Sequence, residues 1–99
     1  MAFEVELHDE AELDYRKIIE WYEKQAPGLG KRFYSLMDKL LKKLEAHPLN
    51  YSYYSKPYRH TILKGFPYRI VFKVEKINVR IVAIFHTSRN HKALRKRLK

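Results

Sequence analysis

The apolar and polar positions of the chain predict one short strand followed by two helices. Residues 3–7 alternate between apolar and acidic side chains, a period of two that is typical of a strand with one buried face. The apolar residues that follow recur at helical spacing, in two sets separated by Pro27 and Gly28. The first set is Ala11, Tyr15, Ile18, Ile19 and Tyr22, and the second is Leu29, Phe33, Leu36, Met37, Leu40 and Leu44.

Capping and breaking residues set the boundaries of the first helix. We expect Asp9 to be its N-cap, because Glu12 lies three residues later, where a capping box has an acidic side chain. The helix should end within residues 24–26, because Pro27 and Gly28 follow and neither continues a helix well.

The second helix should begin at Gly28 or Leu29 and end at Ala46. His47 and Pro48 follow, and a residue before proline disfavours helical geometry, so the pair acts as a stop signal. Only a few residues join the two helices. We therefore expect an antiparallel αα-hairpin.

Three β-rich segments follow the helices: Tyr58–Lys64, Tyr68–Glu75 and Asn78–His86. Short polar turns join them, so they should form an antiparallel meander. The preceding residues, Leu49–Lys56, are predicted as a loop. Tyrosines in this loop can stack on nucleic-acid bases or cover the open end of the core, and both interpretations stay open; they are Tyr51, Tyr53 and Tyr54.

The element order predicts an α+β fold: a strand, an antiparallel αα-hairpin and a three-stranded antiparallel meander that together form one mostly antiparallel sheet. A short basic C-terminal segment, Asn90–Lys99, ends the chain. Its few apolar residues allow either a short helix docked weakly on the sheet or a frayed tail. We expect residues 1–99 to be a single domain.

Strand parity separates the polar side chains of the meander. Within 68–75, the alternate residues Tyr68, Ile70, Phe72 and Val74 are all apolar and should face the helices, which leaves Arg69 and Lys73 on the open face. Continued without a break through the last strand, the same alternation places Arg80 and His86 on one face. We therefore expect an open basic face that combines Arg69, Arg80 and His86 with His60 or Arg59.

Charge is the strongest signal in the composition. The chain has 21 Lys and Arg against 11 Asp and Glu, a formal charge of +10, and such a small basic protein attracts polyanions, of which nucleic acid is the commonest. There is no cysteine, no apolar run near twenty residues and no signal-peptide pattern. We therefore expect a cytoplasmic protein without a membrane span.

The motifs of several enzyme classes are absent. The sequence has no glycine-rich phosphate loop, no histidine pair at zinc-ligand spacing and no acidic residue near Ser88 that would complete a triad. We predict no metal and no cofactor. What the open face allows is metal-independent RNA cleavage, in which histidine transfers protons and arginine stabilises the phosphorane. The alternative is structural: His86 caps its strand, and Arg69 pairs with Glu75 or Glu4.

Two segments carry a resemblance to a known family. Pro67 to Phe72, followed by Ile81 to Arg89, resembles the RelE/ParE superfamily of bacterial toxins, which includes plasmid-stabilisation proteins. The upstream order of Ala11, Asp14 and the two apolar helical sets agrees. The resemblance implies a strand–helix–helix–three-strand fold and a toxin that is neutralised when a cognate acidic antitoxin wraps around it. It also allows assembly as a heterotetramer or a larger toxin–antitoxin complex.

The superfamily divides by mechanism. RelE-like members cut mRNA on the ribosome, and the resemblance implies that Arg69 and Arg89 contribute here, with His60 or His86 replacing the lysines and the tyrosine that such members use. ParE-like members inhibit DNA gyrase and need no catalytic set. The candidate catalytic residues are Arg69, His86, Arg89 and His60, and the candidate nucleic-acid-binding residues are Arg59, Lys64, Lys73 and Arg80. A basic nucleic-acid-binding module without toxicity is the alternative function.

Overall fold

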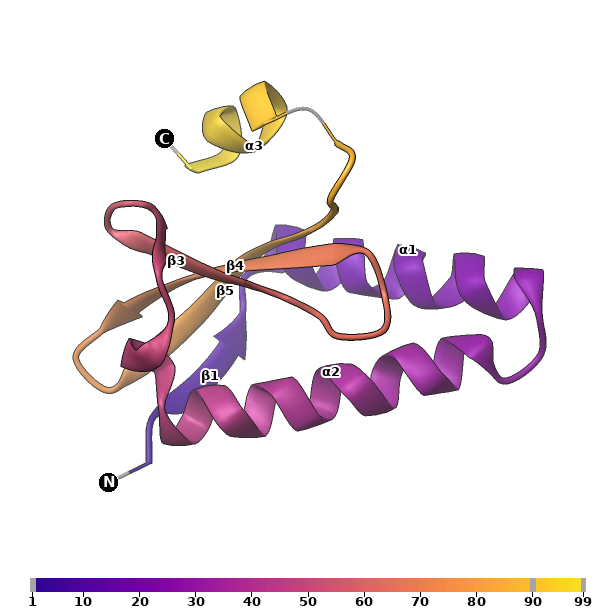
Figure 1. Ribbon diagram of the computed structural model, residues 1–99, viewed down its shortest axis with the longest axis horizontal. Helices are drawn as coiled ribbons and strands as arrows, with labels where there is room; N and C mark the ends of the chain where they lie inside the picture. The colour runs from indigo at the N-terminus through magenta and orange to yellow at the C-terminus, as the bar shows by residue number, and fades with distance from the viewer. Residues whose placement is uncertain (1, 90, 99) are drawn as a thin grey trace.

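The computed structural model, which describes residues 2–89 and 91–98, has a five-stranded sheet with helices on both faces (Figure 1). Along the chain the elements are β1 (Glu4–Leu7), α1 (Asp9–Gln25), α2 (Leu29–Ala46), the 3-10 helix η1 (Pro48–Asn50), β2 (Tyr53–Ser55), β3 (Tyr58–Ile62), β4 (Tyr68–Glu75), β5 (Asn78–His86) and α3 (His91–Leu98). The strand order is β1-β5-β4-β3-β2, and only the β1–β5 pair is parallel among the described pairs. The predicted α+β class and element order are confirmed.

Helices α1 and α2 form an antiparallel hairpin that lies along one face of the sheet (Figure 1). Their apolar stripes are buried against β4 and β5, with Phe33, Met37 and Leu44 meeting Ile70 and Phe72. Both predicted ends of α2 and the predicted end of α1 are confirmed. Gly28 occupies the left-handed region at φ 88°, which explains why a glycine stands at the tight connection.

The start of α1 differs from the prediction. Its N-cap is His8, and Asp9 is already the first helical residue, with no side chain capping the helix through a hydrogen bond. The His8 carbonyl accepts the backbone N–H of Glu12 instead. The acidic residues of the first turn, Asp9, Glu10 and Glu12, still lie where the helix dipole stabilises negative charge.

The segment predicted as a loop before the meander contains an additional strand. Residues Tyr53–Ser55 pair with β3 as the edge of the sheet, so the C-terminal part of the sheet has four antiparallel strands instead of three. The segment predicted to extend to Lys64 ends as a strand at Ile62. The following turn is closed by a hydrogen bond from the Leu63 amide to the Tyr68 carbonyl at 2.9 Å.

A β-bulge in β5 changes the face on which the end of the strand presents its side chains. Val71 pairs with Ala83 and Phe72 pairs with Ile81, so Val82 is an extra residue on β5. Before the bulge Ile81 faces the helices, as strand parity predicts. After it the alternation is inverted, and Ala83 packs on the opposite side of the sheet.

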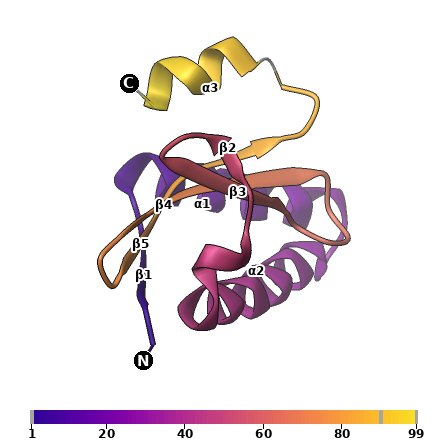
Figure 2. The ribbon, with the colours of Figure 1, turned by 60° about the vertical axis from the view of Figure 1, so that its left-hand side comes forward.

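Helix α3 covers part of the second face, above β4 and β5 (Figure 2). Leu94 is buried there against Val71, Ala83 and Phe85, and Leu98 packs beside them. Residues 91–98 of the predicted basic tail are therefore helical and docked, whereas Asn90 and Lys99 lie outside the described residues. Helix α3 partly covers the face that carries Arg69.

None of the described helices combines the length and the apolar composition that crossing a membrane requires.

Candidate functional site

Arg69 and His60 lie together on the sheet face that α3 partly covers. They come from the adjacent strands β4 and β3, and Arg69 Nη1 donates a hydrogen bond of 2.7 Å to His60 Nδ1. Because a guanidinium can only donate, Nδ1 of His60 must accept, and the imidazole proton is carried by Nε2. The Nε atom of Arg69 is buried without a hydrogen-bond partner.

Two residues from outside the predicted set complete this cluster. Tyr54 of β2 places its ring 5.6 Å from the Arg69 guanidinium carbon and 5.3 Å from the centre of the His60 ring. Its hydroxyl is hydrogen-bonded to Nδ1 of His91 at the start of α3. We call Tyr54, His60, Arg69 and His91 the arginine–histidine cluster.

The cluster contains no carboxylate, and this shapes its electrostatics. Burial lowers the pKa of His60 below its ordinary value of 6.5, and the positive charge of Arg69 lowers it further. The neutral imidazole that results is consistent with Nδ1 accepting from Arg69. The suggested pairing of Arg69 with Glu75 or Glu4 is wrong, because Arg69 bonds to His60 and Glu75 pairs with Lys73 at 3.0 Å.

His86 does not join this cluster. It pairs across the sheet with Tyr68, which faces the α1–α2 hairpin, and the two rings lie 5.3 Å apart. The predicted common face of Arg69, Arg80 and His86 is therefore wrong for His86, because the Val82 bulge turns the end of β5 over. Arg80 and Lys73 pair on the same face as Arg69, as expected.

The local contacts of His86 are those of a turn-capping residue. Its Nδ1 accepts the backbone N–H of Ser88 at 3.1 Å, and the Ser88 hydroxyl lies 2.7 Å from the same nitrogen. This agrees with the structural alternative in which His86 caps the strand end. His86 also lines a surface hollow together with Arg89, Asp14 and Lys17, so Arg89 lies near His86 in this hollow.

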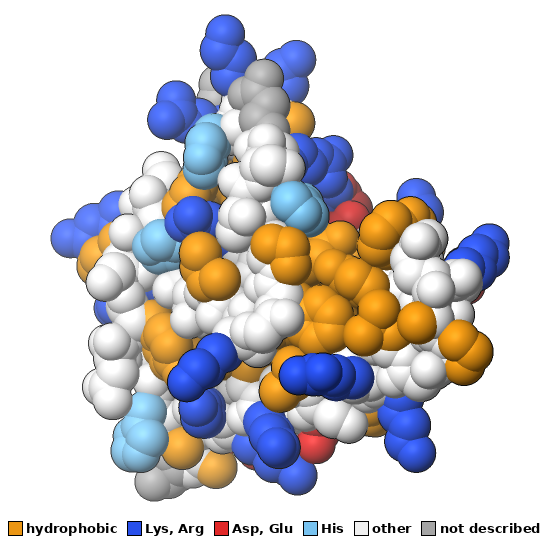
Figure 3. Space-filling view, turned by 45° about the vertical axis from the view of Figure 1, so that its right-hand side comes forward, with side chains coloured by type: hydrophobic (Ala, Val, Ile, Leu, Met, Phe, Trp, Pro, Cys, Tyr) orange, Lys and Arg blue, Asp and Glu red, His pale blue; other side chains and the backbone are white. Residues whose placement is uncertain are grey.

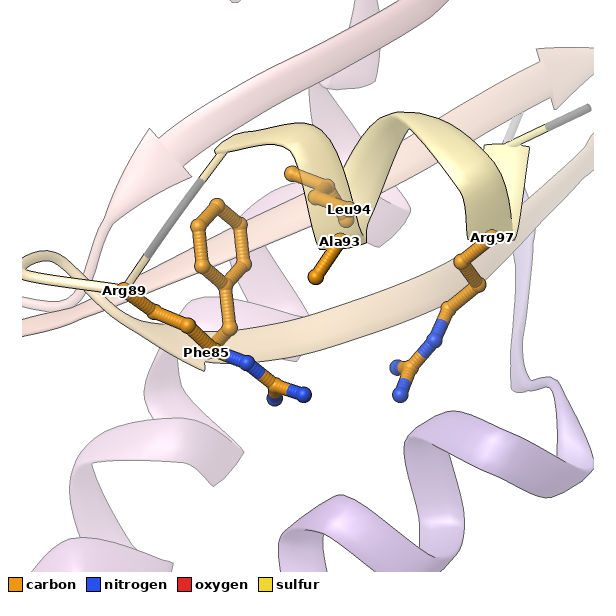
Figure 4. Close-up of a pocket in the computed structure, with 5 residues that line it drawn as sticks. All are labelled: Phe85, Arg89, Ala93, Leu94 and Arg97. Carbon is orange, nitrogen blue, oxygen red and sulfur yellow. The ribbon is translucent and has the colours of Figure 1, made fainter.

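Helix α3 is attached to α1 by an arginine that the sequence did not single out. Arg97 forms an ion pair with Asp14 and a second one with Glu10 at 3.1 Å. Asp14 also accepts the backbone N–H of Ile84 at 3.4 Å. Figure 4 shows the guanidinium groups of Arg89 and Arg97 on the same side of a small pocket that Phe85, Ala93 and Leu94 complete.

The four predicted nucleic-acid-binding residues are dispersed, and three of them have partners. Arg59 donates to the Tyr51 carbonyl at 2.7 Å and lies on the face opposite Arg69. Lys73 pairs with Glu75, and Arg80 pairs with Glu6 at 3.2 Å. Lys64 is exposed beside α2, where it lines a hollow with Lys39 and Lys43. They do not form one surface.

Sequence signals for the missed residues were weak. Leu94 and Leu98 have the spacing of one helix face, which indicates that α3 docks, and Asp14 already belonged to the family pattern. Nothing in the sequence pairs Tyr54 with His91, because 37 residues separate them. Among residues 2–89 and 91–98, no group of three or more His, Cys, Asp or Glu side chains is placed to hold a metal ion.

The geometry allows anion binding more readily than acid–base catalysis. Two imidazoles that cooperate on a phosphodiester must both reach it, one on each side of the scissile bond. Here His60 and His86 lie on opposite faces of the sheet, and each has its Nδ1 engaged as an acceptor. The second imidazole on the face of His60 is His91, and its Nδ1 is hydrogen-bonded to the Tyr54 hydroxyl. The arginine–histidine cluster offers donors to an anion, without a second proton-transfer group from His86.

Solved structures support the fold. The chain is similar to the chromosomal ParDE toxin–antitoxin system of P. aeruginosa, with a TM-score of 0.75 and 16% identity over 86% of this chain and 96% of that one. It is also similar to a double arginine-to-alanine variant of E. coli toxin RelE in the free state, with a TM-score of 0.70 and 16% identity over 100% of both chains. The isolated E. coli RelE toxin gives a TM-score of 0.61 and 19% identity, covering 99% of this chain and 100% of that one.

The family follows from the sequence. No curated protein matches the chain significantly. A family model does match, over residues 5–91, and it describes the ParE toxin of the type II toxin–antitoxin system parDE. That match runs from the second residue of β1 to the first residue of α3, so it includes the whole helical hairpin and all of the sheet except Glu4. The chain therefore belongs to the ParE toxin family of type II toxin–antitoxin systems.

Proposed function

We propose that this protein arrests growth by binding and inhibiting DNA gyrase, without cutting RNA. The observation that carries the proposal is the separation of the candidate catalytic residues. Arg69 and His60 lie on the α3 side of the sheet, whereas His86 lies on the α1–α2 side, and Arg89 lines both a hollow beside α1 and the pocket under α3. A binding toxin does not need these four side chains to converge, whereas an acid–base ribonuclease that used both His60 and His86 would.

Ribosome-dependent mRNA cleavage is the second candidate, and one observation favours it. The arginine–histidine cluster has an arginine without a carboxylate partner beside two imidazoles, which suits a phosphate group. In that mechanism Arg69 and His60 would act on the scissile phosphate, and α3 would have to move away. Catalysis would then depend on His60 and not on His86.

Membership of the family implies a cognate antitoxin. We propose that the antitoxin is acidic, because the toxin carries a formal charge of +10 and opposite charges accelerate and orient association. We also propose that the two proteins assemble as a heterotetramer or a larger complex. Both candidate targets are cytoplasmic, so the toxin should act in the cytoplasm.

One preparation of purified toxin tests both candidates. We expect it to inhibit supercoiling by purified gyrase and to leave ribosome-bound mRNA intact. Induction of the toxin alone should stop growth, and co-expression of the protein encoded beside it should restore growth. Cleaved mRNA together with unaffected supercoiling would replace the gyrase proposal with the ribonuclease, and normal growth at confirmed expression would remove both.

A further inference from the structure

The charge of the molecule is concentrated in one half of the chain. Residues 46–99 contain 13 of the 21 Lys and Arg but only one of the 11 Asp and Glu, Glu75, so their formal charge is +12. Residues 1–45 have a formal charge of −2. Because the basic half folds into β2–β5 and α3, the positive charge belongs to the sheet and to the helix that covers its second face.

Helix α3 turns most of its cations outward. Leu94 and Leu98 face the sheet, and Arg97 is occupied by Asp14 and Glu10. The remaining basic side chains are exposed, and Figure 3 shows Lys and Arg side chains gathered at the top of the molecule, where α3 lies. The exposed residues of this helix are His91, Lys92, Ala93, Arg95 and Lys96.

A groove continues this surface towards the β2–β3 hairpin. It has a volume of about 390 Å³, and Lys56, Lys73 and Arg95 line it together with Tyr58. None of the described residues that line it is acidic, although Lys73 pairs with Glu75 at its edge. The groove and the exposed side of α3 form one continuous basic surface, because Arg95 belongs to both. We call it the α3 basic surface.

We propose that the α3 basic surface binds the phosphate backbone of duplex DNA. Exposed lysine and arginine side chains supply most of the affinity for a phosphate backbone, and such contacts need no particular base sequence. The biological role of this DNA binding rests on the proposed function, because gyrase acts on DNA. A toxin that holds both the enzyme and its DNA would dissociate more slowly than one that holds the enzyme alone.

A duplex fits this surface better than a single strand does. Proteins that bind single strands stack successive bases on free aromatic rings. The ring that lines the groove, Tyr58, is half-buried, with Lys73 Nζ 6.0 Å from its centre and its hydroxyl donating to the Leu98 carbonyl. The exposed ring of Tyr53 on β2 already has the guanidinium carbon of Arg59 at 4.2 Å and Lys56 Nζ at 5.1 Å from its centre. The surface therefore offers cations for phosphates and no bare ring for a base.

Fluorescence anisotropy with a labelled 20-base-pair duplex, without gyrase and at several salt concentrations, tests the proposal. The test variant is Lys56→Gln, Arg95→Gln and Lys96→Gln, and the control is Lys31→Gln, Arg32→Gln and Lys39→Gln. Both variants remove three positive charges from exposed positions, but the control residues lie on α2. We expect the plot of log K against log salt to become shallower by about 0.9 for each lost phosphate contact in the test variant only.

Three results would overturn the proposal. They are no binding of duplex by the wild-type protein at low salt, equal weakening by both variants, and tighter binding of a single-stranded DNA or RNA of the same length. Because this assay contains no gyrase, its outcome is independent of the supercoiling assay. Gyrase inhibition without duplex binding would refute only the proposal that the α3 basic surface binds DNA. Duplex binding without inhibition would refute only the gyrase proposal.

Discussion

The two faces of the sheet are built for different purposes. Among the described residues, the face under α1 and α2 has a cluster of 13 buried apolar residues, whereas the face under α3 has four. The first face holds the fold together by burial. The second face carries the arginine–histidine cluster and helix α3, which a few contacts hold on the sheet. Variants on the two faces should therefore separate global stability from the behaviour of α3.

The largest effect should come from the helical face. Phe72 is fully buried beneath the hairpin and contacts Tyr51 edge-on, so Phe72→Ala removes a large side chain from a closed core. We expect it to lower the free energy of unfolding by about 3–5 kcal/mol, measured by urea denaturation. A loss below about 1 kcal/mol would mean that the core under α1 and α2 does not dominate stability.

Leu94→Ala tests the other face. Leu94 anchors α3 on Val71, Ala83 and Phe85. Because this cluster is small, we expect α3 to detach while the rest of the sheet stays folded. We expect a smaller loss of global stability, below about 2 kcal/mol, together with much faster amide hydrogen exchange in α3. Equal losses for Leu94→Ala and Phe72→Ala would show that the two faces unfold as one unit.

The ion pair between Arg97 and Asp14 should contribute less than Leu94 does. Their side chains are 21% and 16% exposed, so solvent screens the pair only in part. A double-mutant cycle with Arg97→Gln and Asp14→Asn should give a coupling energy near 1 kcal/mol, read from exchange in α3. The exposed pair Arg16–Glu12 provides the control and should give a value nearer zero.

The smallest effect concerns pH. The pKa of His60 is lower in the folded protein than its ordinary 6.5, so below pH 6.5 the unfolded chain binds more protons. Stability should therefore fall as the pH drops from 6.5 through the lowered pKa, and His60→Gln should make that slope shallower. His47→Gln, at an exposed histidine after α2, is the control. An unchanged slope in His60→Gln would contradict the effect of burial and of Arg69 on this imidazole.

Sequence patterns predicted most of the fold because each long element has a clear period. The observed bounds of β4 and β5 agree with the prediction, since polar turn residues flank both. The edge strand β2 was missed because it has only three residues, of which Tyr53 and Ser55 are exposed. So short a segment shows no recognisable alternation in the sequence. The observed N-cap of α1 is His8 and not the predicted Asp9, because backbone hydrogen bonds alone can begin a helix.

The candidate site was harder to predict than the fold. Residues 81–85 are all apolar, so the sequence fits the register with the Val82 bulge as well as the one without it. That single extra residue decides whether His86 faces Arg69. Two members of the cluster were also hidden, because Tyr54 contacts Arg69 from an unpredicted strand, and His91 contacts Tyr54 from a helix that packing places there.

The most direct test of the account removes both imidazoles of the arginine–histidine cluster, which a ribonuclease would use. His60→Gln combined with His91→Gln should inhibit gyrase supercoiling at the same concentration as the wild-type protein, because binding does not require proton transfer. Circular dichroism would verify that the variant is folded. If the double variant loses its toxicity while the wild-type protein cleaves ribosome-bound mRNA, the claim that this toxin acts without catalysis is wrong.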